Sequence, residues 1–156
     1  MNRGLLCFTL LVACLGADFG VLRADEAKPG PPAYAPQVSD FMSETQLRHF
    51  KLWFAGSLKN WPLAEYELDK MKTSFVFADR YAGADAEAFS ASVKSRSDPA
   101  FKALGAAIAA RNSTAFIAGF RQLTGACNAC HESFHVGFIK VQTPTASPFS
   151  NEAFSP

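Results

Sequence analysis

The stretch that decides the fold is residues 112–141, NSTAFIAGFRQLTGACNACHESFHVGFIKV. Its apolar residues recur every three or four positions, which predicts one long helix from Asn112 or Ser113 to about Val141. On a wheel with about 100° per residue, an arc within about 60° of Cys127 gathers apolar residues, the second cysteine and a histidine. The members of this arc are Phe116, Phe120, Leu123, Cys130, His131, Phe134, Phe138 and Val141. The cysteines and the histidine therefore fall in the middle of a predicted buried stripe.

Three further helices are predicted upstream. The first runs from residue 39 or 40 to about residue 59, and the second starts at Trp61-Pro62 and ends at Gly83. The third opens with Asp98 as its N-cap and Pro99 in its first turn, whereas residues 84–97 predict a long connection with a short helical turn. No stretch alternates apolar and polar residues as a strand would. The sequence therefore predicts an all-α domain of four helices.

The first two helices each carry one apolar arc. In the first helix the residues expected to face the core are Leu47, Phe50, Phe54 and Leu58, continued by Trp61. The opposite side of that helix is charged, with Glu44, Arg48, Lys51 and Lys59. In the second helix the expected buried stripe is Ala64, Leu68, Met71, Phe75, Ala78 and Ala82.

The N-terminal residues predict export. Arg3 precedes the apolar run of residues 5–13, which has the charge order of a secretory signal and is too short to cross a membrane. Residues 11–14 resemble a bacterial lipobox, in which the final Cys14 would be lipidated, and conventional cleavage after Ala17 or Ala24 is the alternative. We expect a periplasmic or otherwise exported protein, with a membrane tether if Cys14 carries lipid.

Four segments follow from these patterns. They are a signal peptide at residues 1–24, a proline-rich linker at residues 25–37, a haem-binding helical domain at residues 38–142 and an irregular tail at residues 143–156. The assignment of haem to the third segment rests on the motif described next.

Residues 127–131, Cys-Asn-Ala-Cys-His, follow the pattern C-x-x-C-H, the attachment signature of c-type haem. Two thiols three residues apart lie on one helical face, at the spacing of the two vinyl groups of haem. Cys127 and Cys130 are therefore expected to form thioethers, and His131 is expected to bind the iron as proximal ligand. The cofactor prediction is one covalent haem c.

Two other uses of a Cys-x-x-Cys pair fit less well. A dithiol redox pair is expected at a helix N-terminus, where the helix dipole lowers the thiol pKa, but this pair is in mid-helix among phenylalanines. A zinc site needs further ligands at suitable spacing, and only His49 and His135 remain.

Composition excludes several function classes. Of 156 residues, 49% are hydrophobic and 19% charged, which is ample apolar material for a packed interior. The formal net charge is only +1 and no basic patch is visible, so nucleic acid is not an expected partner. No carboxylate pair, Ser/His set or phosphate loop stands out, so we expect a protein that is not an enzyme.

Four helices with a single C-x-x-C-H motif on the last one resemble the cytochrome c′ family of antiparallel four-helix-bundle haem proteins. The most similar stretch is residues 127–134, including Phe134 three residues after His131. The resemblance is architectural over about residues 38–141 and extends to the motif over about a dozen residues. His135 stands where that family usually has Arg or Lys, so the proximal electrostatics are expected to respond to pH. The resemblance implies an antiparallel bundle, a homodimer, and either electron transfer or gas binding.

The ligand on the other face of the iron decides between these functions. His135 follows His131 by one helical turn and is on the same side of the porphyrin, so it is excluded, and Met71 is assigned to the core. His49 is predicted as the distal ligand and Met42 as the alternative, because both share one face of the first helix. Two protein ligands give a closed site suited to electron transfer, whereas an open face binds NO or CO.

Electron transfer with a redox partner protein is the function we expect, and binding or sensing of small gases is the alternative. Arg48 and Lys51 flank His49 and are candidates to meet the haem propionates. A solvated helix face is the other interpretation of these two cations.

Overall fold

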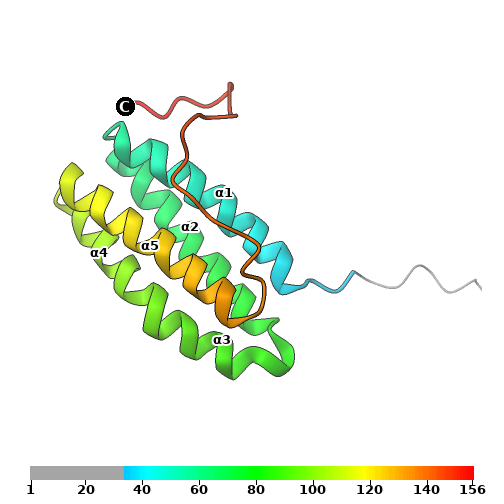
Figure 1. Ribbon diagram of the computed structural model, residues 1–156. Coiled ribbons are helices and arrows are strands. Elements are labelled where there is room, and N and C mark those ends of the chain that lie inside the picture. Colours follow the sequence, from blue (N-terminus) through cyan, green and yellow to red (C-terminus); the bar gives the residue numbers. More distant parts are fainter. Residues whose placement is uncertain (1–33) are drawn as a thin grey trace, which may run out of the picture. The chain divides into compact units, whose positions relative to one another are not determined.

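Four main helices make up most of residues 34–156, the part of the chain that this computed structural model describes (Figure 1). The predicted signal peptide, Cys14 and most of the linker lie outside these residues. None of the helices within residues 34–156 combines the length and hydropathy needed to cross a membrane. The main helices are α1 (Val38–Ser57), α2 (Trp61–Arg80), α4 (Asp98–Ala109) and α5 (Ser113–Ser133).

The helices pack in the order of the chain. α1 contacts α2, α2 contacts α4, α4 contacts α5, and α5 returns to α1. Residues 58–60 link α1 to α2 and residues 110–112 link α4 to α5, so each of these pairs runs antiparallel. The predicted all-α fold of four helices, packed as a bundle, is confirmed.

The two short links have the same backbone conformation. Lys59 and Arg111 adopt a left-handed backbone, with φ of 65° and 51°. In both links the backbone amides of this residue and of the next one donate to carbonyls in the last turn of the preceding helix, as in a Schellman motif. The next residue is an asparagine, Asn60 or Asn112, whose side chain accepts a hydrogen bond from the first turn of the following helix. Each asparagine therefore ends one helix and begins the next.

α5 ends eight residues earlier than predicted. Its last residue is Ser133, and His135 follows with φ of 59°. The amide of His135 donates to the carbonyl of Glu132 and that of Val136 donates to the carbonyl of His131, which is again a Schellman motif. The prediction of a helix to Val141 was wrong because a histidine, rather than a glycine, occupies the left-handed position.

Residues 84–97 are helical rather than a long connection. They contain a 3₁₀ turn (Gly83–Asp85), α3 (Ala86–Ser92) and a π-helical turn, η2 (Val93–Ser97), which continues directly into α4. In η2 the amide of Asp98 donates to the carbonyl of Val93, five residues earlier. Asp98 is therefore not an N-cap as predicted, because the chain is already helical when it reaches this residue.

The buried face of α1 also differs from the prediction. Its buried residues are Thr45, His49, Leu52, Ala55 and Gly56. The predicted arc lies to one side of these positions, with Leu47, Phe50 and Phe54 half-buried and Leu58 exposed. The face that holds His49 is therefore the one that enters the bundle.

The predicted arc of α1 is covered by the chain that follows α5. We call residues 134–156 the C-terminal strap; it has no regular structure and runs back along α1 (Figure 1). Phe149 packs edge-on against Phe50 with 5.5 Å between ring centroids, and the buried Phe154 lies 5.6 Å from Phe54. The apolar arc of α1 thus packs against the strap rather than against the other helices.

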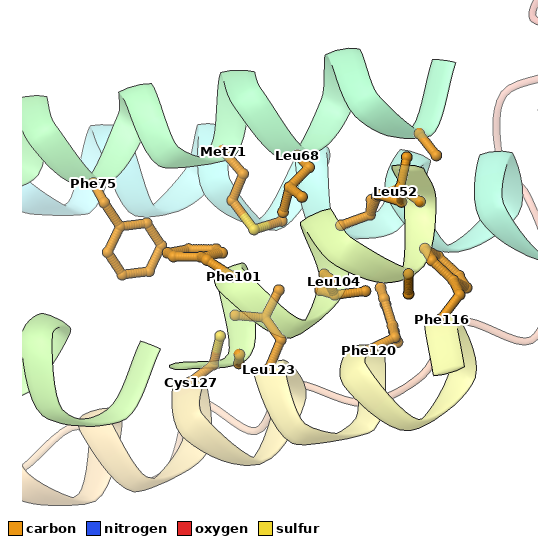
Figure 2. Close-up of a cluster of buried hydrophobic side chains, with 14 of the residues drawn as sticks. Leu52, Leu68, Met71, Phe75, Phe101, Leu104, Phe116, Phe120, Leu123 and Cys127 are labelled. Atoms are coloured by element: carbon orange, nitrogen blue, oxygen red, sulfur yellow. The ribbon is translucent and has the colours of Figure 1, made fainter. Parts of the chain in front are cut away.

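The core itself combines all four main helices, and α1 contributes Leu52 and Ala55 to it. Figure 2 shows Leu68, Met71 and Phe75 of α2 facing Phe101 and Leu104 of α4 and the apolar stripe of α5. Cys127 continues that stripe inward, as the sequence predicted. The thiol pair thus lies at the wall of the hydrophobic core.

Candidate functional site

One small cavity brings together most of the residues singled out in the sequence. It is enclosed by α1, α2, α3, η2, α5 and the strap, and its volume is about 40 Å³. We call it the inner cavity. Cys127, Cys130, His131, His49 and Met42 all line it. The remaining lining residues are Thr45, Gln46, Phe75, Phe89, Ser97 and Val141.

A second hollow adjoins the inner cavity. This outer groove has a volume of about 320 Å³, within the range of small-molecule sites. The two hollows share Met42, Phe89, Cys130 and His131. The remaining residues that line the outer groove are Val38, Ser39, Ala82, Asp85, Phe134, Val136 and Ile139. A larger hollow of about 420 Å³, between α2 and α3–α4, holds none of the predicted site residues.

His131 is held with one ring nitrogen free. Its Nδ1 lies 2.8 Å from the carbonyl oxygen of Ile139 in the strap. A carbonyl only accepts hydrogen bonds, so in the neutral imidazole Nδ1 carries the proton and Nε2 keeps its lone pair. A second hydrogen-bonding partner of this kind is what fixes the tautomer of metal-binding histidines. The imidazole is therefore in the state that can bind a metal through Nε2.

Cys127 and Cys130 are free, buried thiols one helical turn apart. Burial, aided by the neighbouring Cys130, raises the pKa of the Cys127 thiol to about 12. Cys130 Sγ accepts a hydrogen bond from the hydroxyl of Ser92 at 3.4 Å. Reactive redox cysteines have lowered pKa values, so the raised pKa argues against a dithiol oxidoreductase.

His49 is buried deeply, with only 3% of its surface exposed. Its ring lies 4.4 Å from the ring of Phe120 between centroids, and its Nε2 is 2.9 Å from the hydroxyl oxygen of Thr124. That hydroxyl donates to the carbonyl of Phe120, so His49 Nε2 is the donor to Thr124. Burial lowers the pKa of His49 to about 4, and the imidazole is neutral at pH 7.

The lowered pKa of His49 predicts acid sensitivity of the haem-free protein. The unfolded chain binds a proton near pH 6.5, whereas the native state resists protonation down to about pH 4. The free energy of unfolding is therefore highest above pH 6.5 and should fall by about 3 kcal/mol toward pH 4. Urea unfolding at several pH values measures this loss, and His49→Leu should flatten the curve in this window. A variant curve parallel to that of the wild type would contradict the assignment.

The other candidates occupy different surroundings. Met71 is completely buried in the core and lines neither hollow, whereas Met42 lines both. His135 is exposed and belongs to neither lining set. The cations predicted to meet propionates are engaged in ion pairs: Arg48 with Glu44 at 2.6 Å and Glu67 at 3.2 Å, and Lys51 with Glu152 at 2.7 Å. These ion pairs do not support the prediction that Arg48 and Lys51 meet the haem propionates.

Two features of the site were missed in the sequence. Ser97 of η2 lines the inner cavity, is 1% exposed and has no hydrogen-bond partner for its hydroxyl oxygen in the structure. Single π-helical turns often occur at functional sites, but no local sequence pattern predicts the π-helical turn η2. Asn128, inside the C-x-x-C-H motif, makes two hydrogen bonds to the strap. The motif itself places no requirement on that position.

No three side chains of His, Cys, Asp or Glu within residues 34–156 are grouped to hold a metal ion by themselves. Comparisons with models of known families, with curated proteins and with solved structures gave no match.

Proposed function

We propose that this protein is an exported monohaem c-type cytochrome that transfers electrons through a covalently bound haem. One observation carries the proposal. Cys127, Cys130 and His131 lie on consecutive turns of α5 and line one cavity together with His49 of α1. The resemblance of the motif and of the helical order to the cytochrome c′ family supports the same function.

The residues of the cavity fit such a group. Two thiols one turn apart provide both thioether positions, and His131 offers a free Nε2 lone pair. The unpaired hydroxyl of Ser97 costs about 1–3 kcal/mol while buried without a partner, which suggests that a polar atom belongs in the cavity. The inner cavity alone is small, so the adjoining outer groove would hold much of the macrocycle.

Each residue has a distinct role in this proposal. Cys127 and Cys130 hold the group covalently, and His131 binds its iron, which supplies the one-electron ferrous/ferric couple. The apolar side chains of Phe75 and Phe89 exclude water from the cavity. Dry surroundings and a fixed proximal imidazole are the means by which a protein sets the potential of such a couple.

His49 is the proposed distal ligand. It approaches the cavity from α1, whereas His131 belongs to α5. To bind iron through Nε2, His49 would give up its hydrogen bond with Thr124, which contributes about 1 kcal/mol, and its ring proton would move from Nε2 to Nδ1. The imidazole is neutral at pH 7, so this change of tautomer requires no net loss of a proton. Met42, which lines both hollows, is the alternative ligand.

One observation favours a second candidate function, the binding of small gases such as NO or CO. His49 Nε2 already has a hydrogen-bond partner in Thr124, and the ring is packed against Phe120. If this pair persists when haem is attached, the distal face stays open and apolar. Such a face binds neutral diatomic ligands.

Visible spectra of protein made with periplasmic haem attachment test both functions. We expect a ferric low-spin spectrum for the wild type and no reaction of the reduced protein with CO. His49→Ala should convert the site to high spin and admit CO, while Met42→Ala, the matched variant on the same face of α1, should leave the spectrum unchanged.

Two other outcomes are informative. A high-spin ferric spectrum that His49→Ala does not alter, with fast CO binding, would replace electron transfer by gas binding. A purified protein without a Soret band would overturn the haem proposal altogether. Export and a lipid tether at Cys14 are separate proposals, which mass spectrometry of the mature N-terminus tests.

A further inference from the structure

Asn128 connects the haem-attachment motif to the C-terminal strap. Its side-chain Nδ2 donates to the carbonyl of Val141 at 2.9 Å, and its Oδ1 accepts from the amide of Val141 at 2.8 Å. The side-chain amide thus pairs with both polar groups of one backbone residue. No regular secondary structure supports residue 141, so no backbone ladder duplicates these bonds.

The same part of the strap contacts His131. The carbonyl of Ile139, two residues before Val141, accepts from His131 Nδ1 at 2.8 Å. Asn128 and His131 are three residues apart on α5 and therefore share one side of the helix. Three hydrogen bonds from one helical turn consequently hold residues 139–141 against α5.

The other polar contacts of this segment are weaker. The amide of Ile139 donates to the carbonyl of Val136 within the strap itself. Lys140 forms an ion pair with Glu132, but both side chains are about 60% exposed, and such pairs contribute little. The side chain of Val141 packs against the hydrophobic core, but apolar packing does not orient a carbonyl group. The half-buried pairing by Asn128 is therefore the main polar restraint on the position of the Ile139 carbonyl.

We propose that Asn128 is a positioning residue that fixes the tautomer and the orientation of His131 through the strap. By holding the Ile139 carbonyl at Nδ1, it keeps the proton on that nitrogen and leaves Nε2 free. The consequence for iron rests on the proposed function. The effect on the His131 ring does not, because it needs only the three hydrogen bonds.

Two effects are expected in Asn128→Leu. This substitution keeps the approximate size of the side chain and removes both hydrogen bonds to Val141. In haem-free protein, the ¹⁵N chemical shifts of the His131 ring should change from a pure Nδ1–H tautomer to a mixture of both tautomers. In haem-loaded protein the covalent haem should remain, while the midpoint potential rises. A hydrogen bond at Nδ1 makes the imidazole more basic and stabilises ferric iron, so its weakening favours the ferrous form.

Two further variants separate positioning from general loosening. Val141→Pro removes the backbone donor of one of the two bonds from the strap side and should change the ring shifts in the same direction. Lys140→Gln removes the neighbouring ion pair from the same segment and should change neither the ring shifts nor the potential. Circular dichroism verifies that each variant keeps its helices.

The results distinguish failure of this inference from failure of the proposed function. If His131 keeps its wild-type ¹⁵N shifts in both Asn128→Leu and Val141→Pro, Asn128 does not position the ring. If the wild type takes up no haem, the proposed function fails, and the ¹⁵N measurement still decides the role of Asn128. Haem-loaded Asn128→Leu with an unchanged potential would also overturn the inference.

Discussion

Replacing Cys127 and Cys130 together by alanine is expected to abolish covalent haem attachment. Both thiols line the cavity beside His131, and they are the only cysteines within the helical domain. Without them no thioether forms, and any haem that still binds is held by iron ligation alone. Haem-dependent peroxidase staining after denaturing electrophoresis should fall from a strong band to background.

Single variants refine this result. Cys127→Ala and Cys130→Ala each leave one thiol, so each should retain part of the stain at reduced yield. Ala129→Ser changes the motif without touching a thiol or the imidazole, and it should stain like the wild type. Full staining of the double variant would show that the haem is attached elsewhere or that the band is not haem. Circular dichroism of the double variant should retain the helical signal, because small side chains are tolerated at the cavity wall.

Gly56→Ala should lower the free energy of unfolding by about 3 kcal/mol, because overpacking a tight core forces neighbours to shift. Gly56 is buried on α1, and a Cβ atom there would fall within the ring of Phe116. Phe116 has no exposed surface. Trp53 and Trp61 pack against its ring at centroid distances of 6.5 and 6.2 Å, so the ring has little room to move away from a new Cβ atom. Urea unfolding followed by circular dichroism measures the change.

Gly105→Ala is the matched control for this prediction. Gly105 is inside α4, and a Cβ atom there would meet Leu68 at an ordinary contact distance of 3.9 Å. Alanine is the better helix former, so this variant should gain roughly 0.5–1 kcal/mol. Equal behaviour of the two variants would mean that helix propensity, rather than the close approach of Phe116, governs position 56.

The parts of the fold that the sequence predicted correctly depend on local signals. The buried stripe of α5 from Phe116 to Cys130 follows from helical spacing alone. The start of α2 follows from Trp61-Pro62, and Asn60 before it is the observed cap. These features depend on residues within one helix or on its cap, so no knowledge of distant partners was needed.

The errors arose where a distant segment decides the outcome. Phe50 and Phe54 form an apolar arc, and an apolar arc on a helix normally indicates the core. Here the strap, a hundred residues later, covers that arc, which frees the face of His49 to enter the bundle. Likewise the end of α5 depends on a left-handed histidine at position 135, a conformation that residues other than glycine adopt in only a few per cent of cases.

For the site, the sequence identified the chemical groups but not their partners. Cys127, Cys130, His131, His49 and Met42 do line one cavity. The hydrogen bond from His49 to Thr124 and the free hydroxyl of Ser97 could not be predicted, because each depends on how separate helices meet. The hydrogen bond to Thr124 engages Nε2 of His49, and the hydrogen bond to Ile139 engages Nδ1 of His131.

The strap also has a consequence for the order in which this protein folds and opens. Most helix contacts join neighbours in sequence, so most of the bundle requires only short loop closures, and the return of α5 to α1 is the exception. The strap also makes long-range contacts: the side-chain amide of Asn60, in the link between α1 and α2, donates to the carbonyl of Ser155, 95 residues later. Such contacts form late and are the natural place for a partial opening that leaves the bundle intact. Amides around residues 139–155 should therefore exchange with solvent earlier than those of the core helices, and each opening would briefly release the ring of His131 from the Ile139 carbonyl.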